Sequence, residues 1–410
     1  MTRLSMDCRV CGARQVEEVL DLGEQPHCNS LLSEAALDVP EPSYPLRLGF
    51  CTSCTTSQID FTVPKEMMFS EYLYVSGTTS SLRAHFRATA EHLIAALDLS
   101  PGDLVVDIGS NDGTWLAQFQ DLGLKGLGVE PARNLAEAAN RDGIETLNRF
   151  FDRETAELIL AEHGTPKLVT AAGVFFHLEE LHSATAGVAA LCEHGASFCV
   201  QAIYLGGMVE HDAFDQIYHE HLTYWTLTSF ERLIEQYGLE VNSVRVVPIH
   251  GGSLELLVTA AERNPVDHSV GAFRQREVEL GLTEIDTYVA FGERVWKMRD
   301  ALLPILAERA QSGKVVHAFG APAKGATLLN SFRITTDLVV AAVERNPLKI
   351  GKYIPGARIP ILDEESTPAP DAYLMLPWNF LDEFLVRRAD YLRAGGEFIV
   401  PVPEPRIVRS

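Results

Sequence analysis

Tyr218, His219, Glu220 and His221 form a run of four consecutive proton-handling side chains. Consecutive residues cannot all face one way, but on a helical turn Tyr218 and His221 share a face at a spacing of i, i+3. Glu220 can then orient a histidine, as carboxylates do in acid–base sites. The zinc-peptidase patterns H-E-x-x-H and H-x-x-E-H do not occur in the run. The run therefore favours general acid–base chemistry, with an exposed polar turn as the alternative.

Two pairs of cysteines near the N-terminus have the spacing of a metal site. Cys8 and Cys11 form one C-x2-C pair, and Cys51 and Cys54 form the other. Two intervening residues let both thiolates of a pair reach one ion, and four thiolates give the closed coordination of structural zinc. No βαβ pattern surrounds either pair, which disfavours a redox role. We predict a small zinc-binding domain held folded by its metal; the alternative is four core cysteines without a metal.

The middle of the chain contains a strand, a glycine-rich turn, a helix and a second strand that ends in an acid. Gly109 and Gly113 let the backbone approach a ligand closely, and Glu130 stands where a carboxylate can accept hydrogen bonds from ribose hydroxyls. Asp107 ends the first strand, and Asp112 occupies the place of a pyrophosphate in a dinucleotide fold. Carboxylates there repel phosphate but attract the cationic groups of S-adenosylmethionine (SAM). The pattern favours SAM over NAD, with a ligand-free turn as the alternative.

Further cofactor contacts are expected from the same edge of the sheet. A later strand over 168–174 delivers His177 past its carboxyl end, where open α/β sheets bind ligands. His177 is therefore expected to face the cofactor, with a structural hydrogen-bonding role as the alternative. The predicted cofactor-binding residues are Asp107, Gly109, Asn111, Gly113, Glu130, Pro131 and Ala172.

A second α/β unit follows near the C-terminus. A strand over 315–319 leads into a glycine-rich turn with Lys324, and the next helix contains Asn330. Such turns at helix N-termini bind anions, and a lysine adds a full positive charge. We expect Lys324 to contact a phosphate or diphosphate, with an ordinary surface turn as the alternative. A strand over 338–343 then ends in Glu344 and repeats the strand–acid theme of the middle of the chain.

Composition is that of an ordinary globular protein. The 410 residues are 46% hydrophobic and 22% charged, and more than one domain is expected at this length. The formal net charge of -22 repels phosphate backbones, so nucleic acid is not an expected partner. Because no apolar run reaches the length of a membrane span and no signal-peptide core precedes the cysteines, we expect a cytoplasmic protein without a membrane partner.

Four groups of segments together resemble the zinc-containing, SAM-dependent C-methyltransferases of deoxysugar biosynthesis. They are the paired cysteines with 22–26 and Asn29 between them, 71–76 followed by 106–113, 218–222, and 250–253 with 320–325. The resemblance covers nearly the whole chain. That family methylates C-3 of nucleotide-linked 4-keto deoxysugars.

The resemblance implies an α/β fold with three domains. They are a zinc-binding domain (1–70), a Rossmann-like SAM-binding methyltransferase domain (71–260) and a C-terminal Rossmann-like α/β domain (261–410) that helps to bind the sugar nucleotide. The implied substrate is a dTDP-linked 4-keto deoxyhexose, and we expect the protein to act as a monomer.

The resemblance also implies roles for single residues. His221 matches the family's candidate base, with Tyr218, Glu220, His177 and Tyr72 as the other catalytic residues. The residues implied for substrate binding are Tyr74, His250, Gly251, Gly252, Lys324 and Asn330.

The implied reaction removes a proton from the carbon next to a ketone, and the enolate oxygen formed at C-4 takes a hydrogen bond from Tyr218 or His177. The chain departs from the family at Gly173, where an asparagine is usual. Two other functions stay open. One is an O- or N-methyltransferase acting on a sugar or small metabolite, and the other is a non-catalytic zinc scaffold with a degenerate methyltransferase domain.

Overall fold

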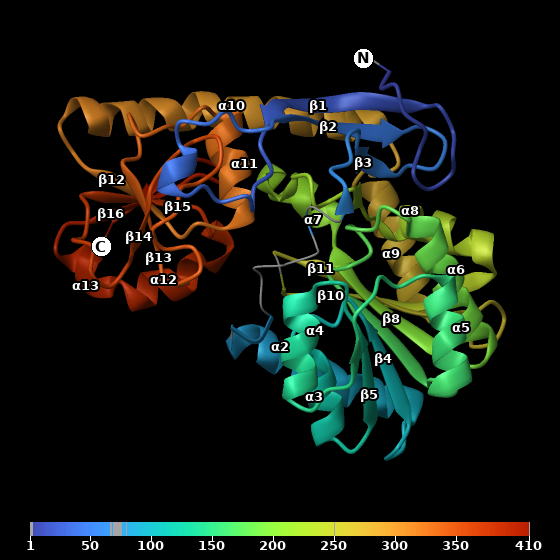
Figure 1. Cartoon of the computed structure of the whole chain (residues 1–410). Coiled ribbons are helices and arrows are strands. Elements are labelled where there is room, and N and C mark those ends of the chain that lie inside the picture. Colours follow the sequence, from blue (N-terminus) through green and yellow to red (C-terminus); the bar gives the residue numbers. More distant parts are fainter. Residues whose placement is uncertain (1–2, 66–67, 69–75, 79, 250, 410) are drawn as a thin grey trace.

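The computed structural model describes residues 3–65, 68, 76–78, 80–249 and 251–409. Tyr72, Tyr74 and His250, which were among the predicted site residues, lie outside these ranges. Three β-sheets, each with its own strand order, organise the described chain, with helices packed against them (Figure 1). This confirms the predicted α/β fold class.

The N-terminal sheet is antiparallel and has the order β1-β2-β3-β9. Its strands are β1 (Val16–Gln25), β2 (Tyr44–Cys51), β3 (Ser57–Ile59) and β9 (Thr223–Tyr224). β9 comes from the middle of the chain, directly after His221, and pairs with β3. This small sheet therefore holds the end of the predicted catalytic run.

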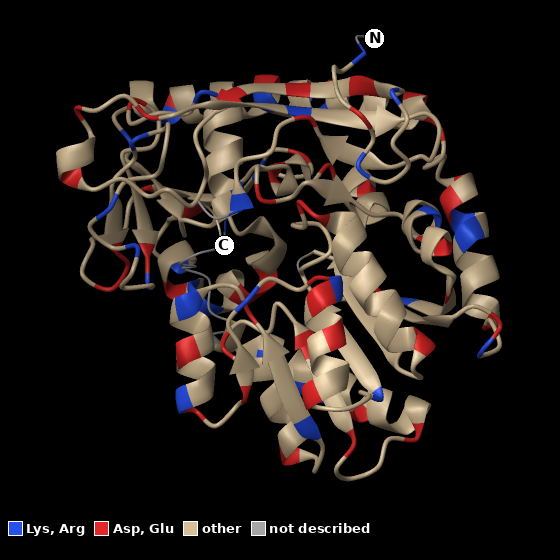
Figure 2. Ribbon diagram, turned by 45° about the vertical axis from the view of Figure 1, so that its right-hand side comes forward, with Lys and Arg blue, Asp and Glu red and all other residues tan. Residues whose placement is uncertain are grey.

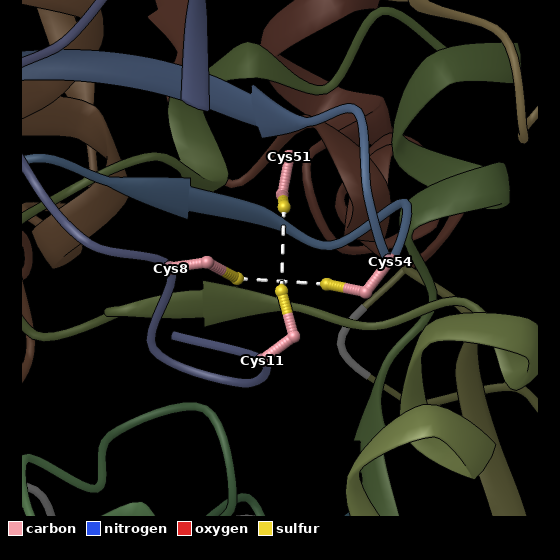
Figure 3. Close-up of side chains that lie close together, drawn as sticks. All are labelled: Cys8, Cys11, Cys51 and Cys54. Atoms are coloured by element: carbon pink, nitrogen blue, oxygen red, sulfur yellow. Dashed lines mark hydrogen bonds between the residues drawn. The ribbon is translucent and has the colours of Figure 1, made fainter. Parts of the chain in front are cut away.

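The four cysteines gather at one end of the N-terminal sheet, with their sulfurs pointing toward one another (Figure 3). The sulfurs lie within 4.8 Å of one another, at 3.5 Å for Cys8–Cys54 and 3.7 Å for Cys11–Cys51. Zn–S bonds of about 2.3 Å in a tetrahedron place sulfurs about 3.8 Å apart. The cluster therefore has the size and the donor set of a zinc site.

The middle sheet is Rossmann-like, with the order β10-β11-β8-β7-β4-β5-β6. β4 to β8 run parallel, and an antiparallel hairpin adds β11 and β10 at the β8 edge. The order reverses beside β4, which is where such sheets form a ligand crevice. The strands are β4 (Leu104–Ile108), β5 (Lys125–Val129), β6 (Thr146–Leu147), β7 (Leu168–Ala172), β8 (Ser197–Ile203), β10 (Leu239–Val247) and β11 (Ser253–Ala260).

Helices cover the middle sheet, with α2, α3 and α4 on one side in Figure 1 and α5, α6 and α8 on the other. Apolar positions at helical spacing face inward; for example, Phe86 of α2 stacks on the buried Trp115 of α3 at a ring distance of 5.0 Å. The helices are α2 (Ser80–Leu97), α3 (Thr114–Asp121), α4 (Arg133–Arg141), α5 (Arg153–Glu162), α6 (Leu181–Glu193), α7 (Leu205–Glu210), α8 (Leu227–Ile234) and α9 (His268–Glu279).

The C-terminal sheet has the order β14-β13-β12-β15-β16-β17 and is parallel except for β17. Its strands are β12 (Val316–Phe319), β13 (Ala341–Glu344), β14 (Ile361–Asp363), β15 (Ala372–Met375), β16 (Glu397–Val400) and β17 (Arg406–Val408). Its helices are α11 (Ala323–Ser331), α12 (Leu381–Arg387) and α13 (Ala389–Arg393).

A long helix joins the middle and C-terminal sheets and runs along β1 (Figure 1). It is α10 (Ile285–Gln311). Gly292 allows the close approach, because a Cβ there would lie 2.6 Å from the carbonyl oxygen of Val19. The short 3-10 turns are η1 (Glu34–Ala36), η2 (Ser76–Thr78), η3 (Phe214–Gln216), η4 (Glu235–Tyr237) and η5 (Trp378–Phe380).

Acidic side chains are spread over the helices and loops of all three regions, with basic ones among them (Figure 2). Within the described ranges, none of the helices combines the length and apolar character needed to cross a bilayer.

We expect Cys51→Ser to lower the zinc content from about one ion per chain to well below half, because it removes one of four ligands. Loss of the metal should also loosen the N-terminal sheet, which limited proteolysis would detect as early cleavage before residue 60. Cys192→Ala, a buried cysteine of α6 outside the cluster, is the matched control and should keep its zinc. A pure wild-type sample without zinc by elemental analysis would contradict the metal assignment.

Candidate active site

A cavity of about 280 Å³ lies at the carboxyl ends of the parallel strands of the middle sheet. Residues at the ends of β4, β5, β7 and β8 form much of its wall, and open α/β sheets bind ligands at this edge. The predicted site residues that line it are Gly109, Asn111, Glu130, Pro131, Ala172, His177, Tyr218 and His221. The cavity thus brings together residues predicted for the cofactor and residues predicted for catalysis.

The turn after β4 has a left-handed backbone at three alternate residues: Gly109 (φ 66°), Asn111 (φ 53°) and Gly113 (φ 76°). A Cβ on Gly109 would lie 2.6 Å from Val174, and one on Gly113 would lie 2.5 Å from Ile144. Glycine is therefore required at both positions for conformation and for space. Gly113 itself is outside the cavity lining and is the N-cap residue of α3, so its role is to shape the turn.

Glu130 directly follows β5 and binds the backbone of that turn. Its carboxylate accepts hydrogen bonds from the backbone N–H of Asn111 at 2.9 Å and of Ala132 at 2.8 Å. Burial raises the pKa of Glu130, and the two N–H donors act against this shift. The side chain is thereby fixed in the position from which an acid can bind ribose hydroxyls.

Asp107 is buried within β4 and does not line the cavity. Its carboxylate accepts a hydrogen bond from Thr170 Oγ1 at 2.6 Å. The pKa of Asp107 is raised to about 7, mainly by burial; the hydrogen bond from Thr170 lowers it and the charge of Glu130 raises it. Two carboxyl groups that are costly to ionise together would both be stabilised by a nearby cation.

Tyr218 and His221 enter the cavity from the irregular segment that follows η3. The backbone N–H of His221 donates to the carbonyl of Tyr218 at 2.8 Å, which closes a turn of the predicted i, i+3 spacing. The two rings lie 3.8 Å apart between centroids, and Phe176 packs edge-on against His221 at 4.6 Å. The turn is therefore the element that brings both side chains to one place.

Main-chain carbonyls determine the tautomer of both histidines. His221 Nδ1 lies 2.7 Å from the carbonyl oxygen of Gln216, and His177 Nδ1 lies 2.5 Å from that of Glu220. Because a carbonyl oxygen can only accept, Nδ1 carries the hydrogen, and in the neutral ring Nε2 carries the lone pair. Burial lowers the pKa of His177, although the charge of Glu220 opposes this, so its ring stays neutral at neutral pH.

The Glu220 carboxylate binds the N-terminal region and does not line the cavity. Its Oε1 lies 3.1 Å from His27 Nε2 and accepts from Asn29 Nδ2 at 2.5 Å. Burial alone would raise the pKa of Glu220. The hydrogen bond and charge of His27, together with the charge of His177 and the hydrogen bond of Asn29, outweigh burial and lower the pKa below its ordinary value. His27 is a residue that sequence reasoning missed, because no motif links it to Glu220 across the chain.

The other predicted substrate-binding residues that the structure describes do not line the cavity. Gly251 and Gly252 form the turn between β10 and β11, next to the cavity residue Ser253. Lys324 and Asn330 lie on α11 in the C-terminal region.

Gln201 of β8 lines the cavity and was also not predicted. It is buried, its Nε2 donates to Glu255 at 2.7 Å, and its Oε1 lies 3.1 Å from His85 Nε2. The sequence offered one signal for it, because Gln201 is a polar residue inside the otherwise apolar stretch 198–203. The network ties α2 to the sheet beside the cavity.

Gly173 lines the cavity with φ 71°, a backbone conformation that glycine and asparagine adopt most readily. A Cβ there would meet only a ring carbon of Phe176, at 3.8 Å. The chain therefore leaves room at the position where the resembled family usually carries an asparagine side chain.

Three family models match consecutive parts of the chain. They are a zinc binding domain over 8–69, a methyltransferase domain over 82–244 and a C-methyltransferase C-terminal domain over 248–403. Among solved structures, the Haloferax volcanii methyltransferase in complex with the activator Trm112 is 18% identical, covering 45% of this chain and 94% of that chain with a TM-score of 0.36. Magnesium protoporphyrin IX methyltransferase from Synechocystis PCC 6803 with bound SAM is 13% identical, covering 44% of this chain and 79% of that chain with a TM-score of 0.33.

The C-methyltransferase NovU of Streptomyces niveus is similar over nearly the whole length of both proteins. The two are 34% identical over 407 residues, which is 98% of this chain and 97% of NovU. The cysteine cluster and the cavity both fall within the matched domains. The chain therefore belongs to the family of SAM-dependent C-methyltransferases that carry an N-terminal zinc-binding domain.

Proposed function

We propose that the protein transfers a methyl group to C-3 of a dTDP-linked 4-keto deoxysugar through an enolate intermediate, as a cytoplasmic monomer. One observation carries this proposal: His221, with its Nδ1 hydrogen committed to a carbonyl, lines the same cavity as Gly109 and Glu130. A base able to form a carbanion is what C-methylation needs and what O- or N-methylation does not.

The cofactor is assigned to the side of the cavity formed by the ends of β4 and β5. Glu130 would accept hydrogen bonds from the ribose hydroxyls, and the glycine-rich turn would allow close contact with the nucleoside. Asp107 and Glu130 favour a cation nearby, because each carboxyl group alone is costly to ionise there. SAM supplies an electrophilic methyl group on a cationic sulfur.

His221 is proposed as the base. A hydrogen on the carbon next to a ketone is weakly acidic, and Nε2 of the neutral ring takes that proton while the bonding electrons move into the enolate. The imidazolium that forms keeps its Nδ1 hydrogen bond to Gln216, which becomes charge-assisted and therefore stronger.

Tyr218 is the better donor to the enolate oxygen at C-4. The sequence left Tyr218 and His177 as alternatives. His177 already donates its Nδ1 hydrogen to the carbonyl of Glu220, and its lowered pKa keeps Nε2 without a proton. A neutral His177 can thus accept at Nε2 but cannot donate there, whereas the hydroxyl of Tyr218 can do both.

Glu220 is proposed as a positioning residue. Its carboxylate is bound by His27 and Asn29, away from the cavity lining, while its carbonyl oxygen accepts from His177. Holding the carboxylate therefore also holds the main-chain acceptor that fixes His177.

The function is tested by incubating the protein with labelled methyl donor and a panel of 4-keto sugar nucleotides that vary at C-3 and in the nucleotide base. We expect a product whose NMR spectrum has a new methyl singlet on a quaternary carbon. A methyl signal on oxygen or nitrogen would contradict C-methylation. A calorimetric titration without any SAM binding would indicate the non-catalytic scaffold.

We expect His221→Asn to lower kcat by about a thousandfold or more, because asparagine cannot take the proton. The affinity for SAM, measured by calorimetry, should stay within about twofold, since the cofactor contacts are on other strands. His211→Asn is the matched control: His211 also lies with Nδ1 against a carbonyl, that of Gly207 at 2.9 Å, but it is exposed and outside the cavity. Full activity of His221→Asn would remove this residue from the role of base.

We expect Glu220→Gln to keep kcat within about tenfold of wild type and Glu220→Ala to lose about a hundredfold. Glutamine retains Oε1 as an acceptor for Asn29 and so retains the position of the segment, whereas alanine does not. If steady-state assays find the glutamine variant as inactive as the alanine variant, the charge of Glu220 takes part in the chemistry and the positioning role is wrong.

We expect Asp107→Asn to stabilise the protein at alkaline pH and to weaken SAM binding. The carboxyl pKa is about 7 in the folded chain against 3.8 ordinarily, so between these values the folded chain keeps a proton that the unfolded chain has lost. The free energy of unfolding therefore falls as pH rises through this window, and asparagine removes a loss of about 4 kcal/mol at about pH 8.

Urea unfolding should show that gain at about pH 8 and no gain at about pH 4. Asp121→Asn, an exposed carboxylate at the end of α3, is the control and should change neither stability nor the Kd for SAM. The same stability difference at both pH values would refute the raised pKa.

A further inference from the structure

We propose that the C-terminal region sets the orientation and tautomer of His221 by holding the residues on either side of Gln216. Asp215, Lys324 and Thr327 are then positioning residues for the base. The inference rests on the proposed role of His221.

Asp215 lies in η3 and is fully buried, with 0% of its surface exposed. Its Oδ2 accepts a hydrogen bond from Trp378 Nε1 at 2.7 Å and lies 3.7 Å from Lys324 Nζ. Trp378 and Lys324 both belong to the C-terminal region, on η5 and α11. The Asp215 carboxylate thus links η3, which precedes His221, to the C-terminal region.

The Lys324 ammonium group is held beside Asp215 by further contacts. Its Nζ donates to Asn379 Oδ1 at 2.6 Å and lies 4.3 Å from the ring centroid of Trp378, and the side chain is 12% exposed. Burial lowers the pKa of Lys324 and raises that of Asp215, and the charge of each partner opposes the shift of the other. Removing one partner leaves a buried charge uncompensated, so the pair is costly to break.

Thr327 holds the other side of Gln216. Its Oγ1 donates to the carbonyl oxygen of Ile217 at 3.0 Å, and Thr327 and Ile217 are both buried. Thr327 and Lys324 lie one turn apart on α11, which packs against η3. Residues of α11 therefore contact both chain neighbours of Gln216, which are Asp215 and Ile217.

The carbonyl oxygen of Gln216, which lies between these two contacts in the chain, is the acceptor for His221 Nδ1 at 2.7 Å. The peptide that carries this carbonyl ends η3, and its N–H, that of Ile217, donates to the carbonyl oxygen of Phe214 at 2.9 Å. The residues from 217 to 222 that follow belong to no helix or strand. If the peptide of Gln216 rotated, Nδ1 would lose its acceptor and the ring could take the other tautomer, with the hydrogen on Nε2. A base with that tautomer presents no lone pair to the substrate. The contacts of α11 with Asp215 and Ile217 therefore determine whether the His221 ring can act as a base.

The test compares Thr327→Val, Asp215→Asn and their combination with the matched control Ser331→Ala. Ser331 lies on the same helix, and its hydroxyl accepts a hydrogen bond from Gln25 Nε2 of β1 at 2.8 Å. The Thr327 and Ser331 variants each remove one buried hydroxyl hydrogen bond from α11. Thr327→Val alone carries the test if the aspartate variant does not fold, because valine keeps the shape of threonine.

The first readout is the ¹⁵N NMR spectrum of the protein labelled at histidine nitrogens, in which His221 is identified by the signals lost in His221→Asn. In wild type and Ser331→Ala we expect Nδ1 protonated and Nε2 unprotonated. In the combined variant we expect the two resonances to move toward a tautomer average. An unchanged His221 tautomer in the combined variant would overturn the inference.

The second readout is steady-state kinetics. We expect kcat of the combined variant to fall by roughly tenfold to a hundredfold, with the Kd for SAM within about twofold of wild type, while Ser331→Ala keeps its kcat. Equal loss of kcat in both would indicate a general structural effect and contradict positioning. The NMR readout needs no substrate, so it separates failure of this inference from failure of the proposed reaction, which the wild-type product assay decides.

Discussion

Two hydrogen bonds from imidazole Nδ1 atoms to main-chain carbonyl oxygens define what the cavity can do. They leave the lone pair of His221 and of His177 on Nε2. Both acceptors, Gln216 and Glu220, belong to one short segment, so the proton chemistry depends on the path of that backbone. A side-chain acceptor could move independently of the fold, but a carbonyl oxygen moves only with the chain.

That segment is held from three directions. The N-terminal region binds the Glu220 carboxylate through His27 and Asn29 and takes β9 as its fourth strand. The C-terminal region holds Asp215 and Ile217. The middle domain contributes the carbonyl of Phe176, which accepts from the N–H of Leu222 at 2.7 Å. The cysteine cluster is thus connected to the segment of the proposed base, because β2, which ends in Cys51, pairs with β3, and β3 pairs with β9.

Electrostatics divides the cavity into two functional sides. The side proposed for the cofactor presents Glu130, with Asp107 behind it in the sheet, and a nearby cation would stabilise both carboxylates. The opposite side presents the imidazoles of His177 and His221 and the phenol of Tyr218, all of which can donate or accept protons. Lys324, the cation that the sequence suggested for a phosphate, lies 3.7 Å from Asp215 and donates a hydrogen bond to Asn379.

Sequence alone determined the features that depend on local spacing. The cysteine pairs, the glycine turn after β4 and the acid ending β5 each follow from contacts within a few residues or from a strand–turn–helix unit. The turn that joins Tyr218 to His221 has the same local origin. Only the tertiary structure decided which way Glu220 faces and what binds the carbonyl of Ile217, because His27 and Thr327 lie 193 and 110 residues away from these partners in the chain. Hydrogen bonds across such separations are set by domain packing, and the local residue pattern carries no information about them.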